Sequence, residues 1–115
     1  MTDAVIDKAT FEALEQSTGA DFAKELVDTF LAEAPEMLKA LRQAFADKNV
    51  ELFRRTAHSL KSNSNTFGAM KLGTLARDLE LGATDAVKAS SPTALNALDA
   101  EYARVADALK VLRNA

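Results

Sequence analysis

The chain has 115 residues and one histidine, His58, which is the strongest candidate for chemistry in the sequence. A neutral imidazole nitrogen is a nucleophile near neutral pH and can accept a proton or a phosphoryl group. Arg54, Arg55 and Lys61 lie within about one helical turn of it. A lysine there could meet a dianionic phosphoryl group as a mobile point charge with three donors. The first chemistry to consider is therefore transfer of an anionic group to His58.

Other kinds of site are excluded by composition. The chain contains no cysteine, so it holds no disulfide, thiolate zinc site, iron–sulfur cluster or cysteine nucleophile. A single histidine cannot build a multi-histidine metal site. No glycine-rich phosphate loop precedes a helix, and no acidic cluster surrounds His58 in the sequence. We therefore expect no metal, no cofactor and no ATP site in this chain.

Charge and hydropathy indicate an ordinary soluble globular domain. The chain is 48% hydrophobic and 27% charged, with a net charge of −3, which argues against a nucleic-acid partner. Its apolar runs are too short to span a membrane, and the N-terminus has no signal-peptide pattern. We expect a cytoplasmic protein with no membrane or nucleic-acid partner.

Apolar spacing predicts an all-α protein, with residues 1–115 forming one domain. A short N-terminal helix is expected over about 8–16. Four longer amphipathic helices follow, over about 21–46, 50–66, from 69 to a fading end near 82–85, and from 90–92 to about 113. Short connections between long helices favour an antiparallel four-helix bundle, here over about 21–113.

Residues at the ends of these segments supply helix signals. Asp7 and Asn49 can cap the first and third helices, and Ser90-Ser91-Pro92 can open the last with a serine cap and a proline in the first turn. Gly68 can end the third helix in a left-handed conformation. The apolar stripe keeps its phase across Pro35, which indicates one kinked helix.

The same stripes predict the core and leave a few apolar residues outside it. Well-filled stripes indicate a monomer. Four aromatic side chains are expected in the core: Phe11, Phe22, Phe30 and Phe45. Three residues off the main seams could form an exposed patch: Val27, Leu31 and Leu81.

A helical wheel places His58 outside the core. Phe53 and Leu60 fall roughly opposite it, so the ring should point outward. Residues 62–66 are small, weak helix formers, which would leave the histidine standing above low neighbours. Such a face suits close approach by the active site of another protein.

Several of these residues form a longer pattern. It comprises Ala57-His58-x-Leu60-Lys61, then Phe67-Gly68-Ala69, then Leu72-x-x-Leu75-Ala76-x-x-Leu79-Glu80, with Phe30-Leu31-x-Glu33-Ala34-Pro35 before it. This pattern resembles histidine-containing phosphotransfer (HPt) domains, the four-helix bundles of bacterial and fungal phosphorelays. The resemblance runs from about Ala20 to the end of the chain. One departure is Ser62, where the family commonly has glycine.

The resemblance implies a role for each matching residue. His58 would be the phosphoacceptor through Nε2, Lys61 would stabilise the phosphoryl group, and Gly68 would be the glycine beside the site. We expect five further residues to govern access and docking: Arg54, Arg55, Ser62, Asn65 and Phe67. The implied partners are a hybrid sensor histidine kinase and response-regulator receiver domains, which would supply the Mg²⁺ and the aspartyl phosphate.

Other functions remain open from the sequence. The protein could be a helical adaptor that carries no phosphate, with His58 an ordinary surface residue. It could instead be the phosphoacceptor domain of a chemotaxis-type kinase, with an ATP-bound kinase domain as donor. A hydrolase with His58 as general base is a weaker alternative, because no nucleophilic serine or carboxylate is obviously paired with it.

Overall fold

The computed structural model describes residues 5–89 and 92–114, and this part of the chain is all helical. Its helices are α1 (Lys8–Thr18), α2 (Ala20–Ala46), α3 (Val50–Thr66), α4 (Met70–Leu81), α5 (Ala83–Ala89) and α6 (Thr93–Arg113). Within those ranges no helix combines the length and apolar character needed to cross a membrane.

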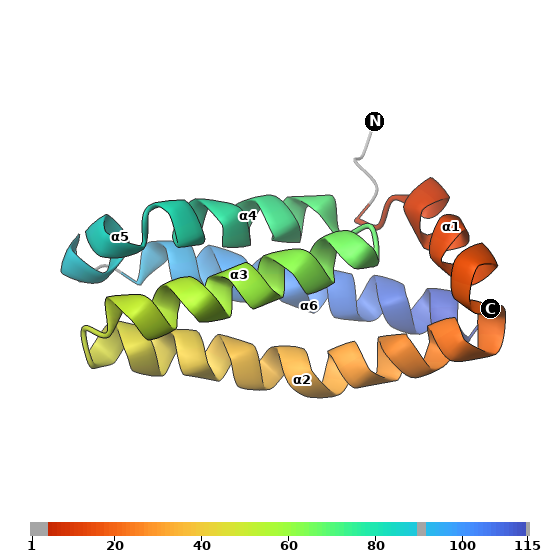
Figure 1. Ribbon diagram of the computed structural model, residues 1–115, viewed down its shortest axis with the longest axis horizontal. Helices are drawn as coiled ribbons and strands as arrows, with labels where there is room; N and C mark the ends of the chain where they lie inside the picture. The colour runs from red at the N-terminus through yellow and green to blue at the C-terminus, as the bar shows by residue number, and fades with distance from the viewer. Residues whose placement is uncertain (1–4, 90–91, 115) are drawn as a thin grey trace.

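The long helices lie side by side and alternate in direction along the chain (Figure 1). Helix α3 packs between α2 and α4, and α6 contacts α2 and α4 from behind. Helix α1 lies across one end and contacts α2 and α3. The buried apolar residues form a single core between these helices, which leaves the outer face of α3 open to solvent.

The predicted helix signals at Asp7, Asn49 and Gly68 are confirmed. The Asp7 carboxylate accepts from the Thr10 amide at 3.3 Å, and the Asn49 side chain accepts from the Leu52 amide at 3.1 Å. Gly68 has φ +83°, and the Asp7 amide donates to its carbonyl at 2.8 Å. A Cβ on Gly68 would lie 2.7 Å from the Asp7 carbonyl oxygen. Glycine is therefore needed both for the turn and for the contact with the N-terminal segment.

Some helix boundaries differ from the prediction. The first helix continues two residues further, to Thr18, because Gly19 is the first residue with positive φ. Pro35 lies within a single helix α2, as predicted. Proline removes one backbone hydrogen bond, and the buried residues on both sides of it hold the helix together.

The segment after Gly82 is not a fading end but a separate short helix, α5. Ala83 and Val87 are buried on one side of it, and this packing stabilises a helix too short to form alone. Pro92 occupies the N-cap position of α6 rather than its first turn. The expected serine cap at 90–91 lies outside the described residues.

Two core predictions on α2 are wrong. The side chain of Phe22 is 50% exposed, whereas Val27 is fully buried. Helix α2 has 27 residues and α3 only 17, so the start of α2 extends past α3 and cannot bury Phe22 against it. Val27 is buried because α2 packs on several helices, which covers a wider face than one seam.

Five other predictions concern apolar exposure. Leu81 is 70% exposed, as predicted, whereas Leu31 is partly buried against the core. Phe11 and Phe30 are buried, and Phe45 is partly buried, as expected for core residues.

Helices α3 and α4 make the most extensive contact in the fold. Gly73 is a buried residue on the α3-facing side of α4. A Cβ built there would lie 2.1 Å from Oδ1 of Asn65 on α3. The absent side chain therefore allows the two helices to approach closely at this level.

We predict that the effect of Gly73→Ala depends on Asn65. Alanine is favoured over glycine inside a helix by about 1 kcal/mol, but its methyl group would displace the Asn65 side chain. Urea unfolding followed by circular dichroism should show a stability gain of about 1 kcal/mol in an Asn65→Ala background and a smaller gain, or a loss, in the wild-type background. Equal effects in both backgrounds would contradict this contact.

Candidate functional site

His58 lies on the outer face of α3, and its side chain is 57% exposed. Three residues on the opposite side of the same helix are buried: Phe53, Ala57 and Leu60. Burial of that apolar face fixes the rotation of α3 and turns the imidazole toward solvent. The predicted outward orientation of His58 is confirmed.

A carboxylate from the neighbouring helix holds the histidine. Glu80, near the end of α4, places Oε2 2.8 Å from His58 Nδ1. Its other oxygen, Oε1, lies 2.9 Å from Lys61 Nζ. The side chains of Glu80 and Lys61 are only 18% and 25% exposed, so the bridge is partly shielded from water. One carboxylate thus connects the histidine to the lysine one turn away.

These contacts keep Glu80 ionised. The Lys61 ammonium, followed by the His58 ring, lowers the pKa of Glu80 below its ordinary value. A carboxyl group that already ionises in acid solution is therefore fully charged at neutral pH. An ionised carboxylate paired with Lys61 therefore lies beside Nδ1 of the histidine ring.

The geometry distinguishes the two ring nitrogens of His58. An ionised carboxylate can only accept hydrogen bonds, so Nδ1 must carry the proton in the contact with Glu80. In the neutral ring the lone pair then resides on Nε2. The exposed side of the imidazole is thus suited to nucleophilic attack through Nε2.

The close approach of α3 and α4 at Gly73 sits in register with this pair. His58 and Asn65 are seven residues apart on α3, and Gly73 and Glu80 are seven residues apart on α4. Seven residues are about two helical turns, so both pairs lie on the same seam between the antiparallel helices. Contact at one pair helps to fix the separation at the other.

Arg54 and Arg55 each form an ion pair on the surface of α3. Arg54 lies 3.2 Å from Glu51, and Arg55 lies 3.9 Å from the same carboxylate. Glu51 is one turn before them on α3 and neutralises part of their charge. Glu80 is the charged residue in contact with His58, and its place in the sequence motif gave no sign of a role at the site.

The remaining predicted site residues fall into two groups. Ser62 and Asn65 are exposed on α3, on the same side as His58. Phe67 and Gly68 are buried at the end of that helix, and Phe67 packs on Phe30 with ring centroids 5.1 Å apart. Gly68 follows His58 by ten residues, or about 15 Å along the helix. It supports the turn after α3 and does not lie beside the histidine.

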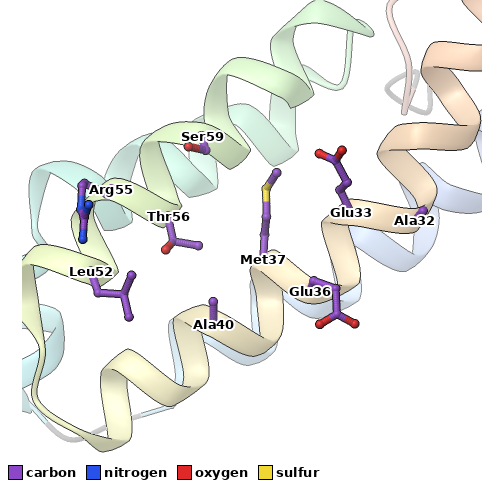
Figure 2. A pocket seen from close by; sticks show the side chains of 9 residues that line it. All are labelled: Ala32, Glu33, Glu36, Met37, Ala40, Leu52, Arg55, Thr56 and Ser59. Atoms are coloured by element: carbon purple, nitrogen blue, oxygen red, sulfur yellow. The ribbon is translucent and has the colours of Figure 1, made fainter.

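A groove runs between α2 and α3 (Figure 2). Its volume is about 610 Å³, and Ser59, the residue after His58, lies on its wall. The floor is largely apolar, with Glu33 and Glu36 on the α2 side and Arg55 on the α3 side. The other lining residues are Ala32, Met37, Ala40, Leu52 and Thr56.

No set of three or more histidine, aspartate or glutamate side chains is close enough to hold a metal ion within residues 5–89 and 92–114. Glu80 provides a single carboxylate beside His58, and Lys61 already neutralises it. The site offers a nucleophile, a hydrogen-bond acceptor and a cation.

Comparison with known proteins identifies the family and the fold. The Hpt domain family matches residues 25–108. The structure is similar to the crystal structure of histidine-containing phosphotransfer protein B (HptB) from Pseudomonas aeruginosa PAO1, with a TM-score of 0.89 and 26% sequence identity. That match covers 98% of this chain and 97% of the other. A search of curated proteins found no match. Because the family match spans most of the chain, including His58, Lys61 and Glu80, the protein belongs to the Hpt domain family.

Proposed function

We propose that this protein is a phosphorelay carrier that accepts a phosphoryl group on Nε2 of His58 and passes it to a response regulator. The observation that carries the proposal is the exposed imidazole whose Nδ1 is held by Glu80 at 2.8 Å, with Nε2 directed away from that contact. Membership of the Hpt family supports histidine phosphotransfer as the general activity.

The transfer step follows from this arrangement. The Nε2 lone pair attacks phosphorus in an aspartyl phosphate of a receiver domain, a P–N bond forms, and the P–O bond to the aspartate breaks. Lys61, one turn from His58, would turn from Glu80 toward the phosphoryl oxygens and offset their charge. The donor's Mg²⁺ belongs to the receiver, and this chain holds neither metal nor nucleotide in the proposal.

The proposed setting is a cytoplasmic two-component pathway. A hybrid sensor histidine kinase would supply the phosphoryl group through its receiver domain, and a response regulator would remove it. The chain would act as a monomer, with α2, α3, α4 and α6 forming the antiparallel four-helix bundle. Support for that arrangement comes from the contacts of α3 with α2 and α4 and of α6 with the same two helices.

The α2–α3 groove would seat the receiver domain. Ser59, the residue after His58, lines it, and its apolar floor has charged side chains at the edges, which is typical of a transient interface. A receiver docked there would bring its aspartyl phosphate above the imidazole. The exposed Ser62 and Asn65 would allow close approach, and Arg54 and Arg55 would contact the receiver at the edge of the interface.

We predict that His58→Gln abolishes labelling by a ³²P-phosphorylated receiver domain. The substitution removes the nucleophilic nitrogen, and the exposed position means that the fold should be retained. Labelling is followed on gels over time with a panel of receivers, and circular dichroism verifies folding. Acid-labile, alkali-stable label on the His58→Gln variant would show that the acceptor is elsewhere.

The same assay separates the alternatives. A helical adaptor would bind its partner equally well with or without His58 and would take up no label from any donor. A chemotaxis-type phosphoacceptor domain would be labelled by an ATP-bound kinase domain and not by receivers. The panel therefore includes both classes of donor.

Lys61→Ala should slow phosphoryl uptake by about tenfold or more, because a hydrogen bond to a charged group is worth about 1.5–3 kcal/mol. Lys61→Arg retains the charge and should recover part of the rate. Single-turnover rates at saturating receiver separate this effect from weaker docking. Unchanged rates in Lys61→Ala would remove the lysine from the proposed transfer step.

Two matched substitutions test the groove. Ala32 lies at the groove, whereas Ala103 lies on α6, and both are exposed helical residues. Ala32→Glu should weaken receiver binding by about tenfold, the scale of one desolvated charge in an interface core, and Ala103→Glu should not. Isothermal calorimetry measures the affinity. Equal affinities for both variants would place the docking surface elsewhere.

A further inference from the structure

We propose that Glu80 keeps the Nδ1 proton on the ring after His58 is phosphorylated on Nε2. The phosphorylated side chain is then a positively charged phosphoimidazolium. This is the form of phosphohistidine from which the phosphoryl group leaves most readily. The inference rests on the proposed function, and it assigns Glu80 as the residue that determines how well the carrier donates.

The proton and charge balance of the transfer leads to this role. Before transfer, Nδ1–H donates to Glu80 and Nε2 carries the lone pair. When the Nε2–P bond forms, the ring gains one positive charge while its Nδ1 proton stays in place. The Glu80 carboxylate, 2.8 Å from Nδ1, offsets that charge directly. No proton has to move during uptake.

Donation reverses these changes. As the P–N bond breaks, its electron pair returns to Nε2, and the leaving group is a neutral imidazole. If Nδ1 lost its proton after uptake, the leaving group would be an imidazolate, which is a far stronger base and departs more slowly. A carboxylate that retains the proton therefore keeps the phosphorylated carrier ready to donate.

The other charged groups around the ring do not replace Glu80. On α3, Lys61 is engaged with the opposite oxygen of Glu80, while Arg54 and Arg55 lie near Glu51. The remaining charged side chains of α4 and α5 are exposed to solvent: Lys71, Arg77, Asp78, Asp85 and Lys88. Because Glu80 is mostly shielded from water, its effect on Nδ1 is weakly screened.

An amide at this position would test the charge separately from the hydrogen bond. Glu80→Gln can still accept the Nδ1 proton through its carbonyl oxygen, but it carries no charge to offset an imidazolium. Glu51→Gln is the matched control, because it removes the same charge from the same protein two turns from His58.

The first experiment needs no partner protein. Potassium phosphoramidate phosphorylates histidine chemically, and ¹⁵N NMR of the imidazole then reports whether Nδ1 is protonated between pH 6 and pH 9. In wild type and Glu51→Gln, Nδ1 should lose its proton at a pH at least about one unit higher than in Glu80→Gln. The same midpoint in all three proteins, or a wild-type midpoint equal to that of free phosphohistidine, would overturn the proposal.

The second experiment measures donation. The rate of transfer to a receiver should be nearly constant from pH 6 to pH 8 in wild type and Glu51→Gln. In Glu80→Gln it should fall up to tenfold for each pH unit above its own NMR midpoint. Parallel pH profiles in wild type and Glu80→Gln would refute the role of Glu80.

A chemically phosphorylated protein that donates to no receiver would count against the proposed function instead, because the NMR result does not depend on a receiver.

Discussion

The contact between the Glu80 carboxylate and Nδ1 of His58 is the interaction on which the candidate site depends. It joins two helices, orients an exposed ring and determines which nitrogen carries the lone pair. A solvent-facing imidazole without such a partner would rotate and exchange tautomers. The second oxygen of the same carboxylate holds Lys61, so one half-buried acid positions both groups that a phosphoryl group would meet.

The rest of the fold makes this contact possible. Burial of Phe53 and Leu60 fixes the rotation of α3, and the missing side chain at Gly73 lets α4 approach the same face. Gly68 adopts a left-handed conformation and links the turn after α3 to the N-terminal segment. These features place the two helices in antiparallel register, which brings Glu80 to the level of His58.

The arrangement also explains why little machinery surrounds the histidine. A carrier has to accept and release the same group, so a site that bound it strongly would impede the second step. The described residues supply a nucleophile, one cation and one carboxylate, and a groove of about 610 Å³ lies between α2 and α3. Under the proposed function, the activating groups come from the receiver and leave with it.

The sequence by itself determined the helical class, most helix boundaries, the caps at Asp7 and Asn49, and the outward position of His58, because these depend on local periodicity and short-range hydrogen bonds. It misjudged Phe22 and Val27, whose burial depends on how far neighbouring helices extend. Only the tertiary structure decided that Glu80, 22 residues after His58, contacts it. That contact depends on the register and separation of two packed helices, which no local pattern specifies.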